Sequence, residues 1–241
     1  MPEQKLQLPP DWRSRLRQRL LARPDHRLDQ RAEPRADQPT QSAPALQSAP
    51  ALQAAPALQA APALQAAAVL VPIIERAEAP TLLLTVRASH LRHHAGQISF
   101  PGGRLEAGDA GPAEAALRET EEELGIASRF VEPIGFLADR SVGTGFRITP
   151  VVALVQPGFT LQLGGGEVDQ AFELPLAFAM ATENYRSRRR MLRGVEREVW
   201  ELPYGEHVVW GATARILAQL RDLLAGAGPA GGPEGGPEGS P

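Results

Sequence analysis

The chain has 241 residues, with 25 basic and 28 acidic side chains, a formal net charge of −3 and no cysteine. This length allows one domain of ordinary size or at most two small ones, and the absence of thiols excludes disulfides, thiolate zinc sites, iron–sulfur clusters and cysteine nucleophiles. No segment has the basic excess of a general nucleic-acid binder, so we expect phosphate recognition to be local and no nucleic-acid partner.

The sequence also lacks the patterns of a membrane protein. No stretch approaches the roughly 18 to 20 consecutive apolar residues that span a bilayer, and the N-terminus does not show the basic and then apolar pattern of a signal peptide. We therefore expect a soluble, cytoplasmic protein with no membrane partner.

Residues 1–40 form an N-terminal arm with one predicted helix. The arm places Trp12, Leu16 and Leu20 at helical spacing, with arginines on the other faces, which predicts a short amphipathic helix. We expect this helix to pack on the main domain; contact with a membrane surface or a nucleic acid is the alternative.

Two segments are predicted to be disordered. Residues 41–67 contain four copies of the unit QxAPAL. The proline in each copy interrupts any α-helix, and one leucine per unit buries too little surface to offset the entropy of ordering. The segment is therefore a linker, acting as a spacer or as a proline-rich docking segment. Residues 226–241, rich in Gly, Pro and Glu, are predicted to be a disordered tail.

Residues 68–225 have the pattern of one α/β domain. A helix is predicted from Pro112, a favoured first-turn residue, to Gly125, a favoured stop signal, and a closing amphipathic helix covers 212–224. Together these elements favour a mixed sheet with helices on its faces. Strands are predicted at 69–74, 82–87, 134–138, 148–155, 198–202 and 207–210.

The predicted helix that begins at Pro112 carries a cluster of carboxylates. Residues three and four positions apart share a helix face, so Glu119, Glu122 and Glu123 point the same way and repel one another. The cluster is either a solvated acidic face or a site for Mg²⁺ or Mn²⁺, whose charge would remove the repulsion. The preceding Gly-Gly pair permits a backbone that presents a carbonyl, that of Gly103, to the same ion.

The arrangement of this segment resembles the Nudix box, whose pattern is G-x5-E-x7-R-E-U-x-E-E-x-G-U with U aliphatic. The matching residues are Gly103, Asp109, Arg118, Glu119, Glu122, Glu123, Gly125 and Ile126. There are three departures: Asp109 replaces a Glu, eight residues rather than seven precede Arg118, and Thr120 occupies the first aliphatic position. The resemblance implies a Nudix-type α/β/α sandwich with a mixed sheet, and hydrolysis of a nucleoside diphosphate linked to another group.

A second resemblance is more selective. Residues 83–103, LLTVRASHLRHHAGQISFPGG, are similar to the signature LLTxRSxxLRxHxGQISFPGG of coenzyme A pyrophosphatases, with Ala88 in place of the usual Ser. Residues 209–217 also resemble the start of that subfamily's C-terminal helix. The implied reaction cleaves coenzyme A, a small-molecule substrate, into 4′-phosphopantetheine and adenosine 3′,5′-bisphosphate.

Roles for individual residues follow from these patterns. Metal ligands are expected at Glu119, Glu123, Glu122 and the Gly103 carbonyl, and Arg118 is expected to orient Glu119. Arg87, Arg92, His94 and Arg104, on or beside the loop that enters the box, are expected to bind substrate phosphates. The general base is a helix Glu or a distant carboxylate, for which Glu167 is favoured over Asp169 and Glu173.

Several alternatives stay open at this point. The substrate could instead be ADP-ribose, a dinucleotide or a nucleoside triphosphate. The domain could be a non-catalytic Nudix-fold binding module, or the N-terminal arm could be an interaction segment with catalysis secondary. The sequence leaves the oligomeric state open, with a homodimer among the alternatives.

Overall fold

A computed structural model describes residues 8–24, 64–91, 95–142, 145–164, 166–192 and 194–226. The repeat units before Leu64 and the tail after Gly226 lie outside the described residues. The described part holds the N-terminal helix and most of the predicted α/β domain.

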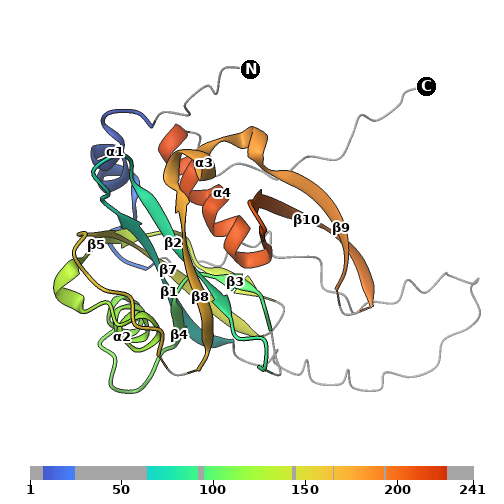
Figure 1. Ribbon diagram of the computed structural model, residues 1–241, viewed down its shortest axis with the longest axis horizontal. Coiled ribbons are helices and arrows are strands. Elements are labelled where there is room, and N and C mark those ends of the chain that lie inside the picture. Colours follow the sequence, from blue (N-terminus) through green and yellow to red (C-terminus); the bar gives the residue numbers. More distant parts are fainter. Residues whose placement is uncertain are drawn as a thin grey trace, which may run out of the picture.

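The centre of the described fold is an eight-stranded mixed sheet with the order β3-β2-β1-β7-β5, in which β4, β6 and β8 pair with β1, β7 and β2 (Figure 1). β1 and β7 run parallel, and the other pairs are antiparallel. Both central strands are apolar along most of their length because helices cover both faces of the sheet. The strands are β1 (Gln65–Ile74), β2 (Thr81–Arg87), β3 (Ile98–Ser99), β4 (Gly102–Arg104), β5 (Val131–Phe136), β6 (Arg140–Val142), β7 (Phe146–Val155) and β8 (Val168–Pro175).

Helices form a layer on each face of this sheet, which confirms the predicted α/β/α sandwich (Figure 1). On one face lies α2 (Pro112–Leu124), whose fully buried Ala115 and Ala116 pack against Ala68 and Ala153. Small side chains on both surfaces let this helix lie close to the strands. The other face carries α1 (Trp12–Arg19), α3 (Leu176–Met180) and α4 (Gly211–Ala225). Among the described residues, no helix is both long enough and apolar enough to cross a membrane.

A second, three-stranded antiparallel sheet extends from the main body (Figure 1). Its strands are β9 (Arg186–Leu192), β10 (Val195–Tyr204) and β11 (His207–Trp210), in the order β11-β10-β9. Leu202 and Val209 bury its inner face against the core formed with α4. Short 3₁₀ turns at Ser128–Phe130 and Thr182–Asn184 complete the fold.

The structure differs from the sequence prediction in the extent of some strands. β1 begins at Gln65, inside the segment predicted as linker, because β7 provides parallel backbone partners from the Gln65↔Phe146 pair onward. β9 was not predicted, and no bounds were predicted for β8. Polar residues interrupt the apolar pattern of β8, and four arginines occupy β9, so neither strand shows a simple alternation.

The N-terminal helix packs on the domain as expected. Trp12, Leu16 and Leu20 are buried in the core under the sheet. Arg19 donates hydrogen bonds to the carbonyls of Leu223 (2.7 Å) and Leu224 (3.1 Å) in the last turn of α4, and the Leu223 carbonyl also accepts from the amide of Gly226 (3.3 Å). α1 is therefore an integral part of the folded unit.

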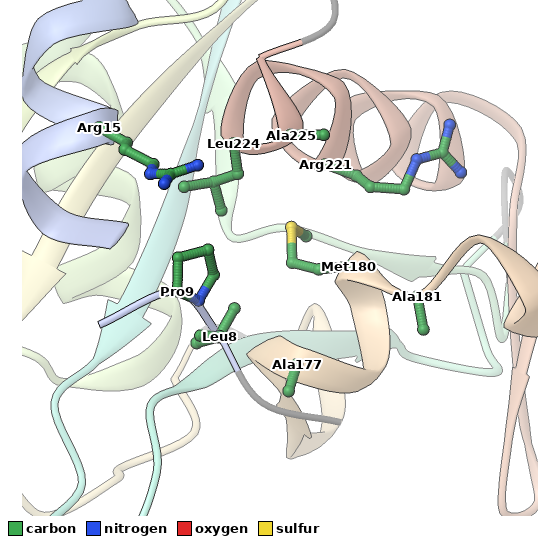
Figure 2. A pocket seen from close by; sticks show the side chains of 9 residues that line it. All are labelled: Leu8, Pro9, Arg15, Ala177, Met180, Ala181, Arg221, Leu224 and Ala225. Atoms are coloured by element: carbon green, nitrogen blue, oxygen red, sulfur yellow. The ribbon is translucent and has the colours of Figure 1, made fainter. Parts of the chain in front are cut away.

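The helical layer on this face also contains an apolar pocket of about 220 Å³. Figure 2 shows the side chains of Leu8, Met180 and Leu224 around it, with the guanidinium of Arg221 turned away. Because α1, α3 and α4 lie across the sheet from α2, this pocket is separate from the carboxylates of α2.

We predict that Leu16→Ala destabilises the protein by about 2–5 kcal/mol, because the fully buried side chain would leave a cavity. Urea unfolding measures this change. Arg13→Gln is the control on the same helix: its ion pair with Glu75 is half exposed and should contribute about 0–1 kcal/mol. Equal stability of Leu16→Ala and the unaltered protein would contradict the packing of α1.

Candidate active site

The helix α2 begins and ends where the sequence indicated. Pro112 opens it, and Gly125 ends it in the left-handed conformation, with φ of 70°, which glycine adopts without strain. Thr120, at an aliphatic position of the box, is fully buried, and its hydroxyl donates to the carbonyl of Ala116 at 2.6 Å. The substitution therefore leaves no unpaired polar group in the core.

Arg118 joins the helix to the loop that precedes it. Its guanidinium donates to both carboxylate oxygens of Asp109, at 3.1 and 3.2 Å, and to the carbonyl of Arg104 at 3.1 Å. It also donates to Glu119 at 3.0 Å and to Glu122 at 3.3 Å. This contact holds the pKa of Asp109 below its usual value and raises that of Arg118, so both groups stay charged and the loop is fixed to the helix.

The paired glycines of the loop lie against the same carboxylates. A Cβ atom at Gly103 would sit 2.3 Å from Oε1 of Glu119, so only glycine allows this approach. The amide of Gly102 donates to Glu123 at 3.2 Å. The backbone of the loop thus touches the first and last Glu of the cluster.

A second backbone segment closes the end of α2. The amides of Gln162 and Gly164 donate to the carbonyls of Leu124 (2.9 Å) and Glu123 (3.0 Å), which have no partner within the helix. A Cβ atom at Gly164 would lie 2.2 Å from the carbonyl oxygen of Glu122. The close contact brings the chain that follows, including Glu167, to the helix.

These elements enclose a small cavity of about 90 Å³ lined by carboxylates from two parts of the sequence. Its walls are Glu119, Glu122 and Glu123 of α2 together with Gly164 and Glu167. The cavity is narrow and acidic, which suits a small cation better than a side chain or an organic group.

Comparison with known proteins identifies the family of this chain. Residues 64–195 match the family model described as NUDIX domain. The chain belongs to the Nudix family. Proteins named "Uncharacterized Nudix hydrolase NudL", from Salmonella paratyphi B and Salmonella newport, are 45% identical to it over 153 residues, which are 64% of this chain and 79% of each relative.

Solved structures of Nudix proteins are also similar. A MutT/nudix family protein from Enterococcus faecalis matches with a TM-score of 0.46 and 16% identity, over 75% of this chain and 66% of that one. The NUDIX domain of Shewanella oneidensis NrtR, solved in complex with ADP ribose, matches with a TM-score of 0.39 and 20% identity, over 49% of this chain and 77% of that one.

Burial makes the Nudix carboxylates difficult to ionise together. The pKa of Glu123 is raised to about 7, mainly by burial and also by the charges of Glu119 and Glu167, against the hydrogen bond from the Gly102 amide and the charge of Arg87. Burial also raises the pKa of Glu119, against the hydrogen bond from Arg118. The site therefore holds more negative charge than its own cations neutralise.

The three glutamates expected as metal ligands line one cavity, whereas Gly103, the fourth expected ligand, is not among its lining residues. Among the described residues, no three acidic or histidine side chains are grouped closely enough to hold a metal ion as they stand. Arg118 donates a hydrogen bond to one carboxylate oxygen of Glu119 and to one of Glu122. In each carboxylate the two oxygens therefore have different surroundings. The donor set, made only of oxygens and carrying excess negative charge, nevertheless fits Mg²⁺ or Mn²⁺.

Of the four residues expected to bind substrate phosphates, the structure describes two, Arg87 and Arg104. Arg87, at the end of β2, lies 3.6 Å from Glu167, and its Nε is buried with no hydrogen-bond partner among the described residues. Arg104 lies over the ring of Phe146, 5.3 Å from its centroid. Arg92 and His94 lie outside the described residues.

The three candidate general bases, Glu167, Asp169 and Glu173, differ in their surroundings. The carboxylate of Asp169 accepts a hydrogen bond from the amide of Ser89 at 2.8 Å. Glu173 is paired with Arg76 and accepts from Thr81, which lowers its pKa. Of the three, Glu167 alone lines the carboxylate cavity. The sequence alone did not predict that Asp109 would bind Arg118, although Asp109 occupies a defined position of the box pattern.

We predict that Gly103→Ala lowers hydrolysis by about 100-fold or more, because the added methyl group displaces the carboxylate of Glu119. Steady-state kinetics and a thermal melt measure activity and folding separately. Gly108→Ala is the matched control, since nothing lies within 4 Å of a Cβ atom there. Equal activity of the two variants would show that the Gly103 contact does not position Glu119.

Proposed function

We propose that this Nudix hydrolase cleaves the diphosphate of coenzyme A or of its derivatives, releasing 4′-phosphopantetheine and adenosine 3′,5′-bisphosphate. The observation that carries the proposal is the position of Arg87. It belongs to the segment 83–103 that resembles the coenzyme A pyrophosphatase signature, and it lies beside Glu167 at the wall of the carboxylate cavity. A cation next to this cavity suits a diphosphate substrate.

We also propose that Glu119, Glu122, Glu123 and the carbonyl of Gly103 hold Mg²⁺ or Mn²⁺. When bound, the metal supplies charge neutralisation at the diphosphate and at the leaving oxygen. Arg118 keeps Glu119 and Glu122 in place through its hydrogen bonds. Gly102 and Gly103 let the backbone approach the helix without a side chain between them.

The proton of the attacking water is assigned to Glu167 in this proposal. Water adds to one phosphorus, the bond from that phosphorus to the bridging oxygen breaks, and the water proton passes to the Glu167 carboxylate. Glu167 lines the cavity and has its side chain about half exposed, so it can exchange the proton with solvent. Arg87, Arg92, His94 and Arg104 would contact the diphosphate and the 3′-phosphate.

Product identification tests this function. We expect the protein with Mg²⁺ or Mn²⁺ to convert coenzyme A faster than dephospho-coenzyme A and ADP-ribose, and mass spectrometry should identify the two products named above. Glu119→Gln and Glu123→Gln should lower turnover by several orders of magnitude while the fold is kept. Faster hydrolysis of ADP-ribose, or near-normal metal-dependent turnover in both variants, would contradict the proposal.

We predict that metal affinity rises with pH because a proton competes with the metal for Glu123. With a pKa of about 7 in the metal-free protein, Glu123 is protonated below pH 7 and ionised above it. The apparent Mn²⁺ association constant should rise about tenfold per pH unit up to pH 7 and level off above it. Calorimetric titration measures this slope. Glu123→Gln should flatten it, and an unchanged slope in that variant would assign the proton to another group.

A further inference from the structure

Strand β8 contains a β-bulge close to its start. β8 lies along β2 (Figure 1), and Val86 of β2 pairs with Gln170. The next residue of β2, Arg87, pairs with Val168. Asp169 is therefore the extra residue between the two pairs. Bulges bend a strand and re-aim its side chains, and they are common next to active sites.

The bulge determines which way Val168 faces. Val168 belongs to the apolar cluster that contains Leu124, the last residue of α2, and Ala171 packs against the same cluster. In a regular strand, residues three positions apart face opposite sides of the sheet, so the extra residue is what turns both toward α2. Glu167 directly precedes Val168 and lines the carboxylate cavity. The bulge thus brings Glu167 beside the glutamates of α2.

The chain before Glu167 does little to orient it. Residues 164–166 are glycines, and glycine has more backbone freedom than other residues. Gly164 touches α2, but at Gly166, with φ of 67°, a Cβ atom would meet nothing within 4 Å in the described part of the chain. The direction of the Glu167 side chain therefore depends on the contacts that follow it in the chain.

Two consecutive amides beyond the end of β2 hold the bulge. The amide of Ala88 donates to the carbonyl of Glu167 at 2.8 Å, and the amide of Ser89 donates to Oδ2 of Asp169, also at 2.8 Å. The first bond fixes the backbone of Glu167, and the second fixes the extra residue of the bulge. Ala88 is fully buried, so this anchor belongs to the packed domain. A carboxylate accepts a stronger hydrogen bond than a neutral group does.

We propose that Asp169 is a positioning residue for Glu167. Its hydrogen bond to the Ser89 amide holds the bulge in the form that sets Glu167 at the cavity. Asp169 is not among the described residues that line the cavity, so it acts through Glu167. The inference rests on the proposed role of Glu167 as the acceptor of the water proton.

The first test compares Asp169→Ala with Asp169→Asn, using coenzyme A as substrate. Asparagine keeps an oxygen that can accept from the Ser89 amide, and alanine does not. We expect Asp169→Ala to lower kcat about tenfold, with KM within about twofold, because the base is misplaced and the binding groups are not. Asp169→Asn should recover most of the loss. Hydrogen exchange at the Ser89 amide should be faster in the alanine variant alone.

A double-mutant cycle shows whether Asp169 acts through Glu167. Glu167→Gln removes the proposed base and should lower kcat about 100-fold. In that background, Asp169→Ala should change kcat by less than about twofold, because no base is left to position. A tenfold loss in both backgrounds would mean that the two residues act independently, and would overturn the inference.

Gln170→Ala is the matched control. Gln170 is the next residue of β8 and is exposed, as Asp169 is. Its backbone pairs with Val86, and removing its side chain leaves that pairing in place. This variant should keep the kcat and KM of the unaltered protein, and thermal melts should show that all variants are folded.

The outcomes separate this inference from the proposed function. If ADP-ribose is hydrolysed and coenzyme A is not, the proposed substrate is wrong, and the same cycle on ADP-ribose tests the inference. Near-normal turnover of Glu167→Gln contradicts the assigned base and the inference with it. A low turnover of Glu167→Gln with a normal kcat in Asp169→Ala overturns the inference alone. An asparagine variant as slow as the alanine variant also overturns it, because the charge of Asp169 would then matter and not its hydrogen bond.

Discussion

The site depends on one cation, the guanidinium of Arg118. It contacts the loop through Asp109 and the carbonyl of Arg104, and the helix through Glu119 and Glu122. Each carboxylate gains a charge-assisted hydrogen bond, which is stronger than one between neutral groups. Without this cation, Glu119 and Glu122 would lose the side-chain hydrogen bonds that hold their carboxylates. The loop and the helix are therefore positioned as one unit.

Two departures from the family pattern both affect the contact between Asp109 and Arg118. Asp109 is one methylene shorter than the usual Glu, and the connection from it to Arg118 is one residue longer. In the structure the carboxylate of Asp109 nevertheless contacts Arg118 through both oxygens. The contact between the loop and the helix is therefore made here by the shorter side chain and the longer connection.

Local signals in the sequence predicted the catalytic helix well and its surroundings less well. Pro112, Gly125 and the three glutamates mark the start, the end and the acidic face of α2, because each acts within a few residues of itself. The approach of Glu167 depends instead on Gly164 touching the carbonyl of Glu122, a contact between segments distant in sequence. No residue pattern announces such a contact. β9 was missed for a related reason, since its four arginines pair with β10 and hide the alternation of a strand.

The boundary between the repeat and the enzyme is set by the active-site loop. β4, which contains Gly102 and Gly103, pairs with the start of β1 through Ala67↔Arg104 and Ala68↔Gly103. The carbonyl of Ala66 accepts a hydrogen bond from Leu105 at 3.1 Å. A Cβ atom at Gly102 would lie 2.3 Å from the carbonyl of Ala68, so the two backbones are in contact.

This contact explains why a segment with the composition of a linker becomes a strand. The alanines of β1 contribute little apolar area and have low strand propensity. They are ordered because β7 pairs with them on one side and β4 on the other, while α2 needs small side chains beneath it. The last residues that resemble the repeat thus support the glycines that touch the carboxylates. Changes from Gln65 onward therefore act on the strand that pairs with β4.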